Sequence, residues 1–445
     1  MLSPAGRIVI REQWLVSWQS HGSFFRDVCP SVLTRFCLYS VLKNLRFADP
    51  FLILFLLDTG TSYTGIGLLL GFERLLSGLL EVPTGILADR WGRRSSLAAC
   101  FVFYAFSFLT FAHTAGLSGA QQAAWLYAAT TLFALGEALR TGSHKAIILD
   151  WLDARGEAEQ ATRVLGIARA FSKASSGLAA LAGGLVLYYS GGYRALFQLS
   201  AVAAVAGFLL MLSYPKVLEG EQRREISREP DLPRPSYRRR LALLAAAPGI
   251  LPLFFQSVVF ESQTRMLLKY YLQPFLKDGL EARGILLVGA GALWVGTNEA
   301  VRNGLGGIGA WLSPRAERRS GGSIPALRDS YRLCFVLSLL VGLCYYQGWM
   351  LGGLGVLALL TMLQNVRRPL FVSAFNRVMD RPQRATTLSI ESQSRSLLTA
   401  ALLPLMGVLA DHLGLVAVFV AISALLGAGL LIRLSGKPSA LQASG

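Results

Sequence analysis

The sequence predicts an all-α membrane protein of about twelve transmembrane helices, arranged as two homologous halves of six. Three observations predict this class. The 445 residues are 53% hydrophobic and 16% charged, with a mean hydropathy of +0.47, whereas soluble domains carry about 25% charged residues. Apolar stretches of roughly 18–25 residues, long enough to cross a bilayer, recur along the whole chain. Short sequence matches also recur at one fixed separation.

The expected helices are apolar stretches bounded by polar or glycine-rich loops. The longest polar segment, from Pro215 to Arg240, is rich in proline and charge and is typical of a linker. The domains are therefore an N-terminal arm (1–37), a first half (38–213), a linker (214–240), a second half (241–432) and a C-terminal tail (433–445). The expected spans are 38–57, 64–87, 95–113, 122–149, 165–188, 193–213, 245–275, 283–312, 331–348, 351–375, 386–409 and 414–432.

The distribution of positive charge predicts the orientation. The chain has 43 Lys and Arg against 26 Asp and Glu, a net charge of +17. With the N-terminus inside, the outward loops contribute only Arg194, Lys277 and Arg283, while the inward loops carry the other loop arginines and lysines. By the positive-inside rule we expect a multi-pass protein of the cytoplasmic (inner) membrane with both termini in the cytoplasm. Basic loops spread along one membrane face favour contact with the lipid bilayer and do not favour nucleic acid.

The two halves share sequence at a separation of 224 residues. Residues 49–52 (D-P-F-L) recur as 273–276 (Q-P-F-L), and Ala161-Thr162 recurs as Ala385-Thr386. Gly183 corresponds to Gly407 at the same separation. These matches predict a parallel repeat of two six-helix units. Pro50 and Pro274 are expected to kink the first and seventh helices at matching depth.

Charged side chains inside the spans point to a polar interior. Every third span (95–113, 193–213, 331–348 and 414–432) has essentially none, so we expect these helices to face lipid and the others to face a polar centre. Many of the charges form pairs three or four residues apart, which either neutralise each other or form a proton or substrate site. The candidate cavity residues are Asn44, Arg46, Asp49, Glu137, Arg140, Glu261, Arg265, Lys269, Glu391 and Arg395.

Within this set, Arg46, Arg140 and Arg265 are candidates for substrate contact, and Glu137 and Glu261 are candidates for proton coupling. The surplus of positive charge favours an anionic small-molecule substrate. His144 is either a proton relay or, more in keeping with a single helix histidine, a packing residue. These residues agree with a transporter that is coupled to protons and with one that is not.

The loop after the second span carries the most specific motif. Residues 81–94 read E-V-P-T-G-I-L-A-D-R-W-G-R-R. This resembles the G-x-L-a-D-r-x-G-r-k/r signature of the major facilitator superfamily, preceded by the E-x-P-T-G that is frequent in bacterial members. The resemblance implies a cytoplasmic latch that favours the outward-facing state, with the alternative that the motif is only a positive-inside loop. The implied latch residues are Glu81, Gly85, Asp89, Arg90, Gly92, Arg93 and Arg94.

The chemistry of the motif agrees with such a role. The carboxylate of Asp89 could lie against the positive N-terminus of the eleventh helix, which starts on the same membrane face. The corresponding segment of the second half, 309–319, is degenerate, because Ser313 replaces the aspartate. The fifth helix also lacks the Gly-Pro pair of drug/proton antiporters, and Arg140 with Gly142 matches the helix-4 proton-transfer pattern only loosely.

The sequence and the resemblance together predict a secondary active transporter that works by alternating access about a midplane site. The alternative is a non-transporting receptor, sensor or assembly scaffold of the same fold. An enzyme is not expected, because the chain has no H-E-x-x-H, G-x-S-x-G or Walker A motif. Its five cysteines and four histidines show no metal-ligand spacing, so neither a metal nor a cofactor is expected. A monomer is the expected state.

Overall fold

The computed structural model describes residues 30–215, 250–378 and 381–432, and every regular element in these ranges is helical. The first half contains α2 (Pro30–Leu42), η1 (Asp49–Phe51), α3 (Leu52–Asp58), α4 (Tyr63–Trp91), α5 (Arg93–Thr114), α6 (Gly119–Arg140), α7 (Ser143–Ala154), η2 (Ala158–Gln160), α8 (Ala161–Ser190) and α9 (Arg194–Leu212).

The second half repeats this order with longer continuous helices. It contains α12 (Ile250–Arg265), η4 (Met266–Tyr270), α13 (Leu272–Glu281), η5 (Leu287–Gly291), α14 (Ala292–Arg319), α15 (Ser323–Tyr346), α16 (Met350–Val378) and α17 (Arg381–Leu430). The last helix joins two predicted spans through a bend at Gly414, whose φ of 77° favours glycine.

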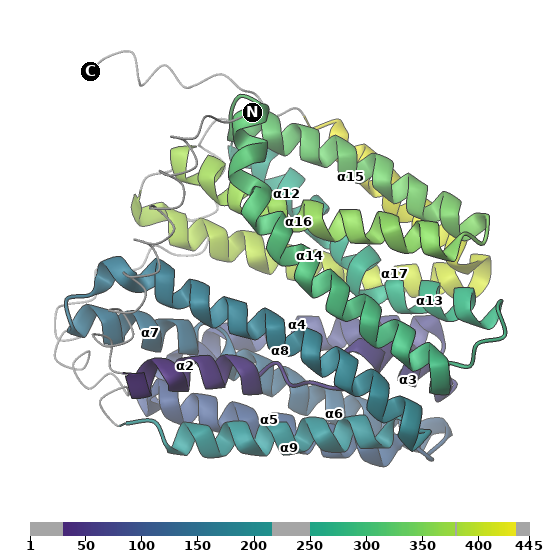
Figure 1. The fold of residues 1–445 in the computed structure, drawn as a ribbon, viewed down its shortest axis with the longest axis horizontal. Helices are drawn as coiled ribbons and strands as arrows, with labels where there is room; N and C mark the ends of the chain where they lie inside the picture. Colours follow the sequence, from purple (N-terminus) through teal and green to yellow (C-terminus); the bar gives the residue numbers. More distant parts are fainter. Residues whose placement is uncertain (1–29, 216–249, 379–380, 433–445) are drawn as a thin grey trace, which may run out of the picture.

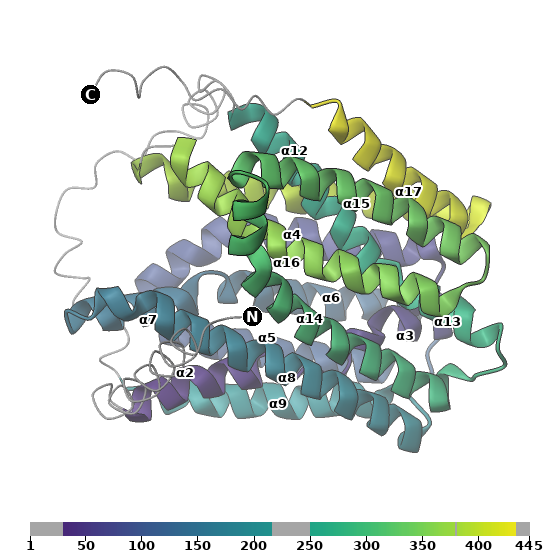
Figure 2. The same cartoon turned by 45° about the horizontal axis from the view of Figure 1, so that its top comes forward.

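The two halves lie side by side as separate bundles with roughly parallel helix axes (Figure 1). Helix α9 ends and helix α12 begins at the same end of the molecule, which we call the linker end. The opposite end, where α3 ends and α13 ends, is the far end. A second view shows α14 beside α8, where the two halves meet (Figure 2).

The halves are in close contact toward the far end. Helix α4 packs along α17, and α8 packs along α14. The backbones approach so closely that a Cβ on Gly407 would lie 2.4 Å from the carbonyl oxygen of Tyr63, and one on Gly296 would lie 2.5 Å from that of Ala180. Such contacts need glycine, as they do in other closely packed membrane helices. The far end is therefore closed.

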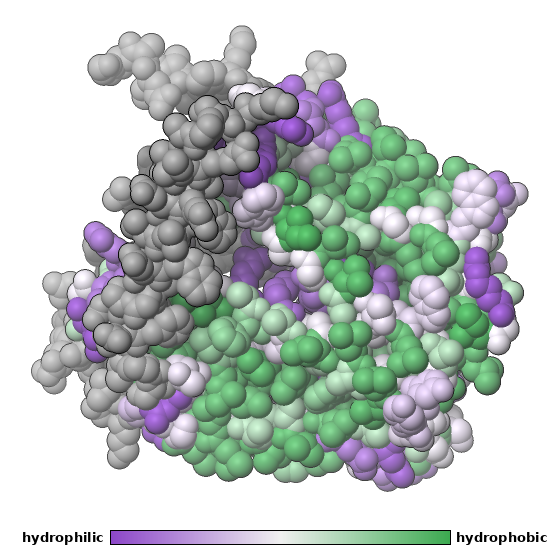
Figure 3. Space-filling model, in the orientation of Figure 1, coloured by the Kyte–Doolittle hydropathy of each residue, from purple (hydrophilic) through white to green (hydrophobic). Residues whose placement is uncertain are grey.

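The linker end is open by comparison. A Cβ on Gly85, on the same helix as Tyr63 but near its other end, would meet nothing within 4 Å. The space-filling view shows hydrophilic side chains in a hollow between two bundles whose outer surfaces are mainly apolar (Figure 3). A polar interior inside an apolar shell is the pattern expected of a protein embedded in lipid.

The first and fourth predicted spans are divided in the structure. Helix α2 begins at Pro30, earlier than expected, because Val32, Leu33 and Phe36 are buried at helical spacing. It ends at Leu42, and the chain leaves the helix before η1, so the first span is broken and not only kinked. The fourth span is divided after α6 at Gly142, which has a φ of 78°.

The seventh span is also interrupted, but the disruption precedes Pro274, which does not itself kink a helix. Its middle section is the π-helical turn η4, and Pro274 lies in the first turn of α13, where its missing N–H costs no helical hydrogen bond. The matching prolines Pro50 and Pro274 thus both follow a disruption in the first helix of their half.

Five helical stretches in the described part of the chain have the length and hydropathy of a membrane span by composition alone. The five are Arg93–Thr114, Ala158–Ser190, Arg194–Leu212, Met350–Phe375 and Ile390–Leu430.

Candidate functional site

A polar cavity of about 460 Å³ lies between the two halves. Its walls come from the break after α2, from η4 and α13, and from α8, α14 and α16. Charged groups at this depth are costly unless they face a cavity or a partner, so they mark a functional interior. The charged lining residues are Arg46, Asp49, Arg265, Lys269, Glu299 and Arg302, and the amide-bearing ones are Asn44, Gln273, Asn298, Asn303 and Gln364.

The break after α2 places the polar residues of the first span in this cavity. Asn44 donates hydrogen bonds through Nδ2 to the Ser40 carbonyl oxygen at 2.7 Å and to Ser172 Oγ on α8 at 2.7 Å. These bonds attach the non-helical segment to α8. Asn44 therefore ties two helices together and also lines the cavity.

Four residues of the first half form what we call the Glu137 cluster: Arg46, Tyr104, Glu137 and Arg140. Arg46 donates to Glu137 Oε1 at 2.7 Å, and Arg140 donates to Glu137 Oε2 at 2.6 Å. The Tyr104 hydroxyl donates to Glu137 Oε1 at 2.7 Å and accepts from Arg140 Nε at 3.1 Å. One carboxylate thus holds two guanidinium groups in charge-assisted hydrogen bonds.

The Glu137 cluster opens into the central cavity. A smaller chamber of about 160 Å³ is lined by Arg46, Glu137 and Arg140, with phenylalanines along its apolar wall. Arg46 and Asp49 line both chambers, so the two are adjacent. Arg46 Nη1 also lies 3.7 Å from Asp49 Oδ2, and its guanidinium stacks 4.5 Å from the Tyr104 ring centroid.

The central cavity carries more positive than negative charge. Within the described part of the chain, neither Arg265 nor Lys269 makes an ion pair, although both line the cavity. On the opposite wall, Arg302 is paired with Glu299 at 2.8 Å and donates to Thr361 Oγ1 at 3.1 Å. The Glu299/Arg302 pair is recognisable by its spacing in the sequence, but only the fold shows that it faces the cavity.

Gln273 and Arg74 take part in hydrogen bonds that join the halves around this cavity. Gln273 Oε1 accepts from the backbone N–H groups of Ile53 at 2.9 Å and Leu54 at 3.3 Å. Nearby, Arg74 Nε donates to the Tyr270 hydroxyl at 3.1 Å. Gln273 is the counterpart of Asp49 in the repeat, and the sequence offers no sign that it bonds across the interface.

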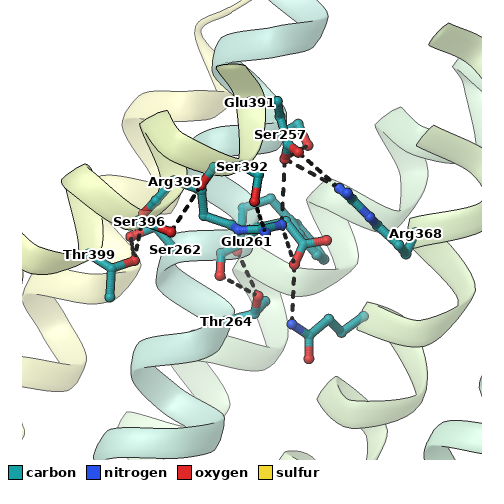
Figure 4. Close-up of polar contacts among 12 residues, drawn as sticks. Ser257, Glu261, Ser262, Thr264, Arg368, Glu391, Ser392, Arg395, Ser396 and Thr399 are labelled. Carbon is teal, nitrogen blue, oxygen red and sulfur yellow. Dashed lines mark hydrogen bonds and ion pairs between the residues drawn. The ribbon is translucent and has the colours of Figure 1, made fainter. Parts of the chain in front are cut away.

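A second polar cluster lies inside the second half, and we call it the Glu391 network: Ser257, Glu261, Arg368, Glu391 and Arg395 (Figure 4). Glu391 is fully buried and accepts from Ser257 Oγ at 3.1 Å and from Arg368 Nη1 at 3.2 Å. Arg395 Nη1 lies 3.7 Å from Glu391 and 4.0 Å from Glu261.

The sequence predicts that three members of this network, Glu261, Glu391 and Arg395, belong to the polar cavity. Glu261, Glu391 and Arg395 are not among the residues that line the two described chambers. Glu391 and Arg395 share a face of α17, as their spacing predicts, whereas Glu261 lies on α12 and pairs with Arg395 across the two helices. Gln364 is the link, because it lines the cavity and donates to Glu261 Oε2 at 3.3 Å. A coupling role for these three residues stays a prediction.

The motif at 81–94 covers the end of α4 and the start of α5, joined at Gly92, whose φ is 94°. Arg93 forms an ion pair with Asp150, and Arg94 donates to the carbonyl oxygens of Met211 at 2.9 Å and Leu212 at 2.7 Å. All of these partners belong to the first half. The side chain of Asp89 lies outside the described side chains, so its expected contact with the start of α17 stays a prediction. The latch role also stays a prediction for the other motif residues, which are Glu81, Gly85, Arg90, Gly92, Arg93 and Arg94.

A contact at the far end is absent from the sequence-based candidates. Asp411, near the bend of α17, accepts from the backbone N–H of Tyr63 at 2.9 Å and of Thr64 at 2.8 Å. It therefore caps the N-terminus of α4 from the other half. The sequence does contain a pattern that could have identified Asp411: residues 407–414 (G-V-L-A-D-H-L-G) resemble residues 85–92 (G-I-L-A-D-R-W-G).

Two helical bundles with a charged chamber between them, closed at one end and apolar outside, define a multi-pass membrane protein of two pseudo-repeated halves. Residues 33–390 match the sequence profile of the Major Facilitator Superfamily, and the chain belongs to that family. No curated protein sequence matches the chain.

Solved structures of similar fold include several transporters. A bacterial homolog of the human lysosomal transporter Spinster, in an inward-facing and occupied conformation, has a TM-score of 0.65 at 18% identity, covering 91% of this chain and 95% of that one. The nucleoside transporter NupG has a TM-score of 0.65 at 13% identity, covering 90% and 96%. A D-xylose–proton symporter has a TM-score of 0.63 at 14% identity, covering 90% and 96%. The shared feature is the fold.

Proposed function

We propose that this protein is a secondary transporter that carries a small anionic molecule by alternating access. The observation that carries the proposal is the central chamber, which is closed at the far end and holds two cations, Arg265 and Lys269, without ion-pair partners in the described chain. Uncompensated positive charge at membrane depth is costly, and a bound carboxylate or phosphate would neutralise it. The chamber amides supply hydrogen bonds to the rest of a polar substrate.

The Glu137 cluster gives this chamber a route to proton coupling. While ionised, Glu137 neutralises part of the charge on Arg46 and Arg140, which lie 2.7 and 2.6 Å away. Protonation would release this charge, and Arg46 would then present more positive charge to the chamber and to an anion within it. A proton and an anion would therefore favour each other's binding, as symport requires.

We also propose that the linker end faces the cytoplasm, so that the described conformation is open inward. The supporting observation is the positive charge of the loops at this end, among them Arg90, Arg93 and Arg155. Labelling of single cysteines introduced next to Arg155 and next to Lys277 tests this orientation in intact cells. A membrane-impermeant reagent that reaches the first position and not the second would contradict it.

Flux into proteoliposomes tests the transport proposal. A panel of labelled carboxylates and phosphate esters, matched by neutral amides and alcohols of the same size, is offered with and without an inward proton gradient. We expect uptake of at least one anion, enhanced by the gradient, and none of its neutral match. Binding of an anion without flux would instead support the receptor or sensor alternative.

A further inference from the structure

A second polar cavity, of about 230 Å³, lies within the first half and toward the linker end. Its walls are α2 and the residue that follows it, the junction of α6 with α7, and α8. The hydrogen bond between Asn44 and Ser172 lies between this cavity and the central chamber, since Ser172 lines the first and Asn44 the second. The two cavities have no lining residue in common.

The charges around this cavity are all positive. Lys43, Arg140, Lys145 and Arg169 line it, and none of its lining residues is Asp or Glu. Arg140 is engaged with Glu137 on its other side. Within the described chain, Lys43, Lys145 and Arg169 form no ion pair; Lys43 instead lies 5.8 Å from the Tyr39 ring centroid. Three cations on three different segments thus converge on one cavity without a protein anion.

The backbone adds to this field. Helix α7 has twelve residues and starts at Ser143, and within the described chain no side chain caps its N-terminus. Gly142, His144 and Lys145, at this N-terminus, line the cavity. Free N–H groups and the helix dipole at such an end favour an anion.

The neutral side chains of the cavity are held in place by packing. His144 stacks on Tyr39, with ring centroids 3.6 Å apart, and its Nε2 lies 3.2 Å from the Tyr214 hydroxyl. The Tyr214 hydroxyl donates its hydrogen bond to the Arg35 carbonyl oxygen at 3.1 Å, so it accepts the hydrogen bond that His144 Nε2–H donates. The histidine is therefore a packing residue and supplies a fixed wall for the cationic cavity.

We infer that this cavity is a second anion-binding site, specific for a phosphate group. Lysine and arginine side chains on three sides, together with an uncapped helix N-terminus, are the donors that bind phosphate in proteins. The phosphate could belong to the headgroup of an anionic phospholipid or to a soluble molecule. The site does not depend on the proposed function, because a protein of this fold that transports nothing would still contain it.

Binding of inorganic phosphate to the purified full chain in neutral detergent tests the site. Thermal unfolding is followed at increasing phosphate, with sodium chloride at equal ionic strength as the blank. In the double variant Lys145→Gln/Arg169→Gln we expect the half-saturating phosphate concentration to rise at least tenfold. Both side chains are exposed, so the unfolding midpoint without phosphate should match that of the wild type.

Three further variants make this result specific. Lys277→Gln/Arg332→Gln removes two cations elsewhere on the protein surface and should change half-saturation less than twofold. Lys145→Arg/Arg169→Lys keeps the charge and should still bind phosphate. Arg265→Gln/Lys269→Gln alters only the central chamber and should leave this site intact. The inference would be overturned if this last variant lost phosphate binding while Lys145→Gln/Arg169→Gln bound phosphate as tightly as the wild type.

A comparison of vesicles of phosphatidylglycerol with vesicles of phosphatidylcholine distinguishes a lipid phosphate from a soluble one. If a lipid headgroup occupies the site, native mass spectrometry should find phosphatidylglycerol retained by the wild type, displaced by inorganic phosphate and lost in Lys145→Gln/Arg169→Gln. If a soluble molecule occupies it, phosphate should stabilise the protein equally in both lipids. Equal phosphate affinity and equal lipid retention in the wild type and this variant would refute the site.

Discussion

Glu137 and Glu391 have nearly the same partners in the two halves of the molecule. Each carboxylate contacts two arginines and accepts a hydrogen bond from a hydroxyl group, from Tyr104 in one case and Ser257 in the other. Their surroundings differ. The Glu137 side chain is 18% exposed and faces a chamber, whereas that of Glu391 is 0% exposed. The same ion-pair chemistry therefore occurs both beside a chamber and in a closed core, and access to the chamber distinguishes the two sites.

The largest expected effect follows from the buried member of this comparison. Glu391→Gln leaves Arg368 and Arg395 without their full counter-charge in the protein interior. Breaking a buried ion pair from one side costs about 3–5 kcal/mol of unfolding free energy. Unfolding of the purified protein in detergent should show this loss.

The matched control is Glu281→Gln, whose side chain is 49% exposed and pairs with Lys277. Exposed pairs contribute about 0–1 kcal/mol, so this change should be nearly neutral. If Glu391→Gln abolished transport while its unfolding free energy stayed at the wild-type value, the network would belong to the transport machinery and the contrast with Glu137 would fail.

Glu137→Gln should act mainly on coupling. The amide resembles the protonated side chain, so the chamber would keep its extra positive charge permanently. We expect substrate exchange to persist and proton-driven accumulation to disappear, with a smaller loss of stability, roughly 1–3 kcal/mol. Counterflow and gradient-driven uptake in the same proteoliposomes measure the two activities. Normal accumulation by this variant would remove Glu137 from the mechanism.

Arg265→Gln and Lys269→Gln should weaken binding without changing coupling. Each removes a charge-assisted contact to an anion, and a loss of about 1.4 kcal/mol would raise KM tenfold. Transport kinetics over a range of substrate concentrations measure the effect. Arg283→Gln, at the far end and outside the chamber, is the control with the same change of charge. An unaltered KM in both chamber variants would rule out their contact with substrate.

The smallest effect is expected at the far end. Asp411→Ala removes the cap that α17 places on α4, and loss of an N-cap costs about 1 kcal/mol. This should shift the equilibrium about fivefold toward conformations with an open far end. Distances between spin labels on α4 and α17 measure the populations. Asp58→Ala, at the same end, is the control, and identical distance distributions in both variants would show that Asp411 does not hold the closed state.

The sequence predicts the helices, the two halves and the helices that carry interior charge, because hydropathy and the repeat are strong signals in an apolar chain. It also identifies Arg46, Glu137 and Arg140 as neighbours of a cavity. It does not predict the break after α2, because the segment around Asn44 and Arg46 contains no proline or glycine.

The sequence also does not predict the direction in which a charged helical face points. The spacing of Glu391 and Arg395 shows that they share a face, but the rotation of α17 within the bundle decides whether that face meets water or protein. The same limit applies to Gln273, whose role depends on a contact with the other half. Sequence periodicity describes one helix at a time, and these roles arise between helices.

Asp49 and Gln273 stand at the same position of the two copies of the repeat, yet one carries charge into the chamber and the other binds two backbone N–H groups across the interface. If the halves descend from one duplicated unit, this position has been divided between two tasks. Both residues line the chamber, but only the glutamine also joins the halves, so the second copy of the repeat combines a place in the cavity wall with a contact that holds the two bundles together.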